Sequence, residues 1–517
     1  MTPISRAAVL SWLDEARAAA QGTPWGEQLL VDQIDALDVL LEPLHLELLR
    51  ALRASGDPHA MPAGRGLVLR ARWLAFGLKK MIHERRARTS TSRPHRVATL
   101  FWPRELTHIN AQLPVLRCLE GRGTSCGVLA CHPKAVEHLR LRGVESVFTC
   151  GAWPQVVRGA RHAGKLRARA AAAAPPLRLP LFRTGAQEVS LEPIWRATVC
   201  RLLSEVFESV ANARSAIEQF QPAEIVIGND LTLHGRAAAL VARNAGVRTA
   251  VLMHGNVTGD ELHGRHVCDA VIVYGEAGRR EMVRHGGDAA RVLVCGAPYL
   301  DDSPRQSGQM DARLQARLQL EPQDRWILVA TSGPGDRISH EHHRLVIENL
   351  LHVAAAMPDV HLVIKLHRKD RVTHYQSALQ GPVASRIHVL PFGESNLPIS
   401  IFDWLQGCPL LLTGASTVAV EAMLLDVPVI TMDFHREIHG VDFIDAGATR
   451  HVTDFAALAA AVAASFASPN SLADVAGRAR QYLADAFYLL DGRSAERTAD
   501  AIESLARQPM GTGASSE

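Results

Sequence analysis

Apolar residues recur every three to four positions close to the N-terminus. This spacing is present in Glu27–Leu41 and Leu44–Leu52, and again in Leu67–Arg88, where apolar side chains alternate with basic ones. Such a period places the apolar side chains on one face of a helix. The sequence therefore predicts a helical extension over residues 1–95, which the polar linker Ser90–Pro94 closes.

Beyond this extension, short apolar runs alternate with amphipathic segments. One set of runs covers residues 97–102, 126–130, 224–228, 248–253, 270–274 and 292–295, and a second set covers 326–330, 361–365, 387–390, 410–412 and 429–431. Buried strands that alternate with helices indicate a parallel sheet covered on both faces. We therefore expect two Rossmann-like α/β domains, 96–305 and 306–490.

Three further segments complete this division of the chain. Residues 160–178, rich in Ala and Arg, are expected to form a surface excursion from the first domain. Residues 491–509 are expected to form a helix that crosses back to the first domain, and residues 510–517 a disordered tail. Ligands of open parallel sheets bind beyond the carboxyl ends of the strands, so two facing sheets predict a cleft between the domains.

The composition is that of an ordinary globular protein. Of the 517 residues, 47% are apolar and 21% are charged, and a chain of this length needs more than one core. The formal net charge of +3 gives no argument for nucleic-acid binding. Eight cysteines occur without a CxxC pair, which favours buried free thiols over a disulfide framework or a zinc site. With no long apolar run, we expect a cytoplasmic protein.

Basic residues are concentrated between Arg65 and Arg96, where Glu84 is the single acid. Two interpretations of this segment stay open. In the first, it is a solvated helix face whose apolar side packs on the core. In the second, it contacts an anionic membrane surface, which would make the protein peripheral to the inner membrane.

The segment Pro409–Asp433 carries the clearest chemistry. An apolar strand runs into small and hydroxylic residues, among them Ser416 and Thr417, and a helix follows. Free backbone N–H groups at a helix start, together with hydroxyls, bind phosphate. Glu421, one turn into that helix, can accept hydrogen bonds from a ribose diol. The alternative is that the two hydroxyls only cap the helix.

Other candidate residues follow neighbouring strands of the second domain. Lys365, His367 and Arg368 end one strand, and all three can contact a donor phosphate. Gly333 follows another strand, where a glycine permits close approach of a ligand. A tight turn is the alternative explanation for Gly333.

Chemistry is expected mostly from the first domain. Asp230 and His254 end adjacent strands, where the carboxylate can act as a general base or a nucleophile and the imidazole can donate to a leaving phosphate. A turn aspartate and a structural histidine are the alternatives. Glu105 and His108, after the first strand, are candidates for the acceptor side. The polar cluster at 260–266 lacks persuasive metal spacing, so no metal is expected there.

Two Rossmann-like halves with a phosphate-type loop in the second resemble the GT-B class of glycosyltransferases. The similarity covers residues 96–507 and rests on segments 107–114 and 414–430. Met253-His-Gly255, Ile364-Lys-Leu-His367 and Asp491–Arg497 are similar to bacterial surface-polysaccharide enzymes with cytidine-activated donors. These are the Kdo transferases of capsule and lipopolysaccharide assembly and the CDP-glycerol polyolphosphate transferases. Those families commonly have proline after the histidine, where this chain has Arg368.

The resemblance implies a glycosyltransferase that moves a sugar, with CMP-Kdo as the leading donor, onto a surface-polysaccharide or lipopolysaccharide acceptor. The partners would be the nucleotide sugar and a glycan or lipid-linked glycan, with neither cofactor nor metal. Three alternatives stay open. They are a CDP-glycerol-type polyolphosphate transferase with His254 as base, a UDP-GlcNAc 2-epimerase that needs no acceptor, and an assembly scaffold without turnover.

Overall fold

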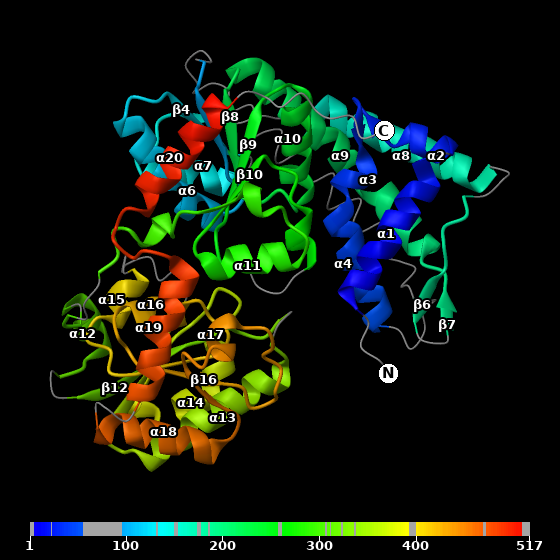
Figure 1. Ribbon diagram of the computed structural model, residues 1–517. Helices are drawn as coiled ribbons and strands as arrows, with labels where there is room; N and C mark the ends of the chain where they lie inside the picture. The colour runs from blue at the N-terminus through cyan, green and yellow to red at the C-terminus, as the bar shows by residue number, and fades with distance from the viewer. Residues whose placement is uncertain are drawn as a thin grey trace. The chain divides into compact units, whose positions relative to one another are not determined.

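The computed structural model describes residues 5–21, 23–54, 96–130, 133–148, 153–172, 177–184, 187–256, 261–304, 308–310, 312–321, 324–335, 338–391, 400–468 and 472–508. The chain divides into two compact units, Met1–Asp301 with Leu490–Glu517, and Asp302–Leu489 (Figure 1). The expected helix Leu67–Arg88, the basic segment up to position 95 and the tail 510–517 lie outside the described residues. None of the described helices is long and apolar enough to cross a bilayer.

A seven-stranded parallel sheet forms the centre of the first unit. Its strand order is β11-β10-β9-β8-β3-β4-β5. The strands are β3 (Thr99–Trp102), β4 (Cys126–Leu129), β5 (Val147–Phe148), β8 (Glu224–Ile227), β9 (Arg248–Leu252), β10 (Ala270–Val273) and β11 (Val292–Val294). Strand β5 was not predicted, because two residues are too few to show a period. The predicted α/β class with a parallel sheet is confirmed for this unit.

Helices cover both faces of this sheet. They include α6 (Leu106–Gly121), α7 (Pro133–Leu141), α10 (Leu233–Asn244), α11 (Glu276–Arg284) and α20 (Ser494–Arg507). Ile502 of α20 is fully buried in the same apolar cluster as Ile109 and Leu116 of α6. Arg122, just after α6, pairs with Asp500 of α20 at 2.7 Å. The last described helix therefore packs on the first sheet.

The N-terminal region is helical, but one predicted helix is wrong. The span Glu27–Leu41 forms α2 (Pro24–Gln28), a hairpin of β1 (Leu30–Val31) and β2 (Ile34–Asp35), and α3 (Ala36–Val39). Asp32 and Gln33 have φ angles of 50° and 68°, which a right-handed helix does not allow. The Asp35 carboxylate then caps α3 by accepting the Leu37 N–H at 2.8 Å. Helices α1 (Arg6–Gln21) and α4 (Leu41–Ala54) flank this segment.

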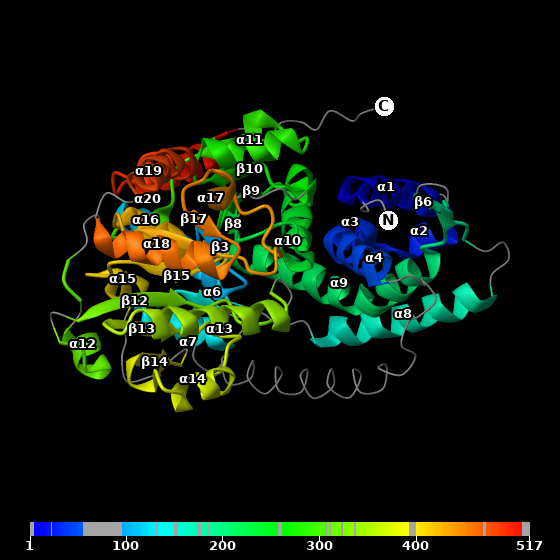
Figure 2. The same ribbon diagram turned by 90° about the horizontal axis from the view of Figure 1, so that it is seen from below.

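The expected surface excursion at 160–178 is corrected by the structure. Residues up to 172 belong to helix α8 (Trp153–Ala172), which lies along α9 (Glu192–Phe220) (Figure 2). Leu166 is buried in the main apolar cluster. A Cβ at Gly159 would lie 2.7 Å from the Ser204 Cα, so the glycine permits the close approach of the two helices. Alanine and arginine favour a helix, which explains why this composition does not form a loop. A small hairpin, β6 (Phe182–Thr184) and β7 (Gln187–Val189), follows.

The second unit contains a six-stranded parallel sheet of order β14-β13-β12-β15-β16-β17. Its strands are β12 (Arg325–Ala330), β13 (Val360–Lys365), β14 (Ile387–Leu390), β15 (Leu411–Thr413), β16 (Val429–Met432) and β17 (Arg450–Val452). Its helices are α12 (Ala312–Leu318), α13 (His340–Ala356), α14 (Gln376–Gln380), α15 (Ile401–Leu405), α16 (Val418–Leu424), α17 (Asp442–Asp445), α18 (Phe455–Ala467) and α19 (Ala473–Phe487). The expected second α/β set is thus confirmed.

Candidate functional site

The carboxyl ends of three adjacent strands bring several predicted residues of the second unit to one edge. Strands β13, β12 and β15 are neighbours in the sheet. Lys365 is the last residue of β13, and its half-buried ammonium group has a pKa lowered by burial and raised in part by Glu421. The Thr331 Oγ1 atom, just after β12, accepts the His367 N–H at 3.0 Å. Two predicted phosphate contacts therefore share this edge with the loop that contains Gly333.

Glu421 has an unusual environment for a carboxylate on a helix. Burial raises its pKa to about 7, against the lowering effects of its own backbone N–H and of Lys365. Its Oε2 atom accepts no hydrogen bond among the described residues. This oxygen is buried, and a buried acceptor without a partner is costly, so a hydroxyl donor from a ligand that reached it would be favourable.

The two predicted hydroxyl residues lie just before α16. Thr417 occupies the N-cap position, but its side chain accepts no hydrogen bond from the helix. The Val418 N–H donates to the Ser416 Oγ at 3.4 Å, which is a long hydrogen bond. Helix capping therefore does not account for Thr417, and its exposed hydroxyl is available to a ligand.

The structure supplies a packing reason for Gly333. Its φ is +67°, and a Cβ there would lie 2.9 Å from the Asp370 N atom. The glycine thus lets the loop after β12 pack against the loop after β13. His367 lies in that second loop, where burial and the charges of Arg368, Lys369 and Lys365 lower its pKa. The side chain of Arg368 is exposed.

In the first unit, His108 and His254 form an imidazole pair. His108 belongs to α6 and is 3% exposed, and His254 follows β9. The ring centroids lie 4.2 Å apart in an edge-on arrangement. The His108 Nδ1 accepts the Arg104 N–H at 3.2 Å, and the His254 Nδ1 lies 3.3 Å from the Gly228 carbonyl oxygen.

These hydrogen bonds give the two rings opposite roles. An Nδ1 that accepts an N–H carries no proton, so neutral His108 has its proton on Nε2 and is a donor there. An Nδ1 that faces a carbonyl must donate, so the His254 Nε2 is an acceptor. Burial lowers the pKa of His108 to about 3, and His254 and Arg104 contribute further. Burial also lowers the pKa of His254, against the opposing effects of Gly228 and Glu105. Both rings are therefore neutral at pH 7.

Glu105 and His108 were predicted together for the acceptor side. Glu105 is exposed at the N-cap position of α6 and makes no side-chain cap hydrogen bond. Its charge raises the pKa of His254, so it contributes to the electrostatics of the imidazole pair. His108 instead lies beneath the surface, in contact with His254.

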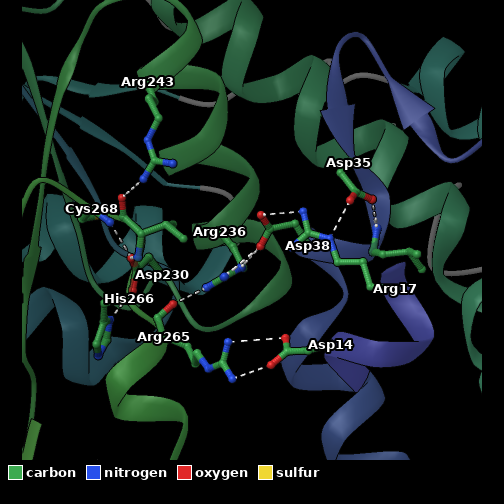
Figure 3. A network of polar contacts seen from close by, with 12 residues as sticks. Asp14, Arg17, Asp35, Asp38, Asp230, Arg236, Arg243, Arg265, His266 and Cys268 are labelled. Carbon is green, nitrogen blue, oxygen red and sulfur yellow. Dashed lines mark hydrogen bonds and ion pairs between the residues drawn. The ribbon is translucent and has the colours of Figure 1, made fainter. Parts of the chain in front are cut away.

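The geometry contradicts a direct catalytic role for Asp230. Its side chain is fully buried, one carboxylate oxygen bonds to the His266 Nδ1, and the other accepts the N–H groups of Val267 and Cys268 at 2.7 and 2.9 Å (Figure 3). Burial alone would raise the pKa of Asp230, but the bond to His266 and the backbone N–H groups hold it well below its usual range. No oxygen is left to attack or deprotonate a substrate. Asp230 instead holds the segment after the 3-10 helix η1 (Glu261–Arg265) in place.

The same segment is tied to the N-terminal helices by ion pairs. Arg236 of α10 pairs with Asp38 of α3 at 2.8 Å and donates to the Arg265 carbonyl oxygen at 2.7 Å. Arg265 pairs with Asp14 of α1 at 2.6 Å (Figure 3). Sequence reasoning missed Arg236 and Arg265, because their partners lie some two hundred residues away and leave no local pattern.

The fold matches solved structures of low sequence identity. A Listeria monocytogenes protein assigned as a UDP-N-acetylglucosamine 2-epimerase has a TM-score of 0.52 at 14% identity, over 80% of this chain and 96% of that one. Staphylococcus aureus MnaA, solved with UDP, has a TM-score of 0.51 at 12% identity over 80% and 100%. The Neisseria meningitidis UDP-GlcNAc 2-epimerase, solved with UDP-GlcNAc, has a TM-score of 0.50 at 13% identity over 78% and 99%. The GT-B-like fold is thereby confirmed.

Sequence comparison identifies the family. No curated protein matches the chain significantly. The family model for UDP-N-acetylglucosamine 2-epimerase matches residues 198–508, which is more than half of the chain and includes strands β8 to β11 of the first sheet and the whole second sheet. The matched region contains His254 and every predicted residue of the second unit. The chain belongs to the UDP-N-acetylglucosamine 2-epimerase family of sugar-nucleotide enzymes.

Proposed function

We propose that this protein binds a UDP-N-acetylhexosamine and inverts its sugar at C2 without an acceptor. The family match supports a sugar-nucleotide substrate, and the Neisseria and Staphylococcus structures contain UDP-GlcNAc and UDP. Of the functions considered from the sequence, the acceptor-independent epimerase agrees best with this membership. A cytidine donor such as CMP-Kdo, and CDP-glycerol, have no comparable support.

The nucleotide is assigned to the second unit. Lys365 and the hydroxyls of Ser416 and Thr417 offer a cation and donors for a diphosphate. Glu421, once ionised, accepts hydrogen bonds from the two ribose hydroxyls through its free oxygen. His367 and Arg368, in the loop after β13, are assigned to the same phosphates.

The proton chemistry is assigned to the imidazole pair of the first unit. Inversion at C2 breaks the C2–H bond, and the electron pair expels UDP from C1 to form a C1=C2 double bond. UDP then adds back at C1 while C2 takes up a proton on the opposite face, so the reaction needs a base and a proton donor. The neutral His254 offers a lone pair on Nε2, and the neighbouring His108 ring, 4.2 Å away between centroids, carries a proton on its Nε2. The observation that carries the proposal is this acceptor–donor pair in a member of an epimerase family. No metal is required for either step.

The proposal is tested with purified protein and UDP-GlcNAc alone in D2O, followed by proton NMR. We expect UDP-ManNAc to appear, with deuterium at C2 of both epimers. His254→Gln should strongly reduce both signals while the thermal midpoint stays within a few degrees of the wild type.

Two outcomes would overturn the proposal. One is consumption of a nucleotide sugar only when a glycan acceptor is present, which would indicate a glycosyltransferase. The other is thermal stabilisation by CMP or CDP but not by UDP, since a ligand that binds the folded state raises its stability. Stabilisation by no nucleotide would favour the scaffold alternative.

A further inference from the structure

Three metal-ligating side chains converge in the second unit, next to the loop that carries His367 and Arg368. His343 lies in the first turn of α13, Asp370 in the loop after β13, and His374 in the 3-10 helix η4 (Val372–Tyr375). One ligand atom from each lies within 4.8 Å of the others. The His343 Nε2 lies 3.2 Å from one carboxylate oxygen of Asp370, and the His374 Nδ1 lies 2.7 Å from the other.

Asp370 is a buried anion without a cationic partner of the lysine or arginine type among the described residues. Its carboxylate has no exposed surface. Burial alone would raise its pKa, but hydrogen bonds from His343, His374, Thr331 and Tyr375 hold it well below the usual range. A buried carboxylate is costly unless a positive charge compensates it.

We propose that His343, Asp370 and His374 bind one divalent transition-metal ion of the zinc type. Two imidazole nitrogens and a carboxylate oxygen are a donor set that Zn²⁺ accepts from proteins. Binding replaces the hydrogen bonds between these groups by bonds to the ion, and the dication neutralises the buried carboxylate. The half-exposed ring of His374 leaves one side of the cluster open to solvent.

The residues around Asp370 are suited to a carboxylate that binds a metal ion. The Tyr375 hydroxyl donates to the Asp370 Oδ2 at 2.8 Å, and metal-bound carboxylates are commonly held by such outer hydrogen bonds. Tyr375 is itself 1% exposed, so its position is set by packing. The cluster therefore has a rigid outer partner already in place.

The ion would fix the loop that carries His367. Thr331, which hydrogen-bonds Asp370, also accepts the His367 N–H, and Gly333 packs on the Asp370 backbone. Coordination of Asp370 and His374 holds the C-terminal end of this loop against helix α13. The ion then acts as a structural anchor and takes no part in the chemical step. This inference does not depend on the proposed function.

The test uses full-length, tag-free protein treated with a chelator and titrated with Co²⁺. We expect a saturable visible absorption at one Co²⁺ per chain that Zn²⁺ displaces, and a higher thermal midpoint of wild type with Zn²⁺. His374→Ala should lose both effects and remain folded, because His374 is half-exposed. His340→Ala, which changes an exposed histidine on the same helix, should keep both.

A second histidine pair serves to locate the ion. The His361 Nδ1 and the His388 Nε2 lie 3.0 Å apart on β13 and β14, so His388→Ala is included. Absorption that His374→Ala keeps but His388→Ala loses would overturn the assignment to Asp370. Absence of stoichiometric Co²⁺ binding by wild type would overturn the metal site altogether and leave a hydrogen-bonded cluster.

Discussion

Gly228 makes room for the imidazole of His108. A Cβ at position 228 would lie 2.8 Å from the His108 Cβ and closer still to the ring. The Gly228 carbonyl oxygen is also the partner of the His254 Nδ1. One residue at the end of β8 therefore determines the positions of both imidazoles.

Gly228→Ala is expected to displace His108 and to lower turnover strongly. Forcing a methyl group into a packed site costs about 1–3 kcal/mol of folding free energy, so the variant should still fold. UDP-GlcNAc epimerisation and urea unfolding measure the two effects. Gly164→Ala is the matched control, since a Cβ there meets no atom within 4 Å. Equal turnover in both variants would show that the His108 position is irrelevant.

His254→Gln is expected to lower kcat/KM by about 10²- to 10⁴-fold, the usual contribution of a general base. Because burial lowers the pKa of His254, the acid limb of the wild-type kcat/KM profile should lie below pH 6.5. The limb should be absent from the residual activity of the variant. If the His254→Gln variant keeps an acid limb at the same pH, another group is the one that titrates.

Glu421 is expected to make nucleotide binding depend on pH. With a pKa of about 7, only its ionised form accepts both ribose hydroxyls, so UDP-GlcNAc affinity should rise as pH increases from 6 to 8. Below the pKa the ionised fraction falls about tenfold per pH unit. Calorimetric titration at several pH values measures this, and Glu421→Gln should bind weakly without the pH dependence.

The raised pKa of Glu421 also predicts that the stability of the fold decreases as pH rises, whereas nucleotide affinity increases. The folded state holds the Glu421 proton between pH 4.5 and about 7, where the unfolded chain releases it. The raised pKa therefore stabilises the fold at low pH, and this contribution is lost as pH rises. Glu421→Gln should unfold at higher urea concentration than wild type at pH 8, with the difference shrinking at pH 5. A constant difference at both pH values would contradict this linkage.

Asp38→Ala is expected to destabilise the first unit. It leaves Arg236, which is 5% exposed, without its carboxylate, and breaking such a buried pair costs about 3–5 kcal/mol. Urea unfolding measures the loss. Glu188→Ala removes the exposed pair with Arg183 and should cost about 1 kcal/mol or less. Equal losses would mean that the Arg236–Asp38 pair is not part of the fold's stability.

The sequence pattern was sufficient to predict the two parallel sheets and the GT-B-like fold. Apolar runs such as Trp326–Ala330 are buried on both faces of a parallel sheet, and such runs do not depend on distant residues. The carboxyl ends of parallel strands meet at one edge, so Lys365 and Ser416 could be placed on the same edge from strand order alone. Their roles, with that of Glu421, stay predictions.

Only the tertiary structure showed which residues far apart in the sequence are hydrogen-bond partners. Asp230 follows a strand like a catalytic carboxylate, yet backbone N–H groups and His266, more than thirty residues later, occupy both oxygens. The helical period of Glu27–Leu41 did not reveal the left-handed turn at Asp32. The sequence determined strands and helices because local burial patterns are repeated along the chain. The availability of a carboxylate or an imidazole depends on hydrogen-bond partners that only folding brings within 3 Å.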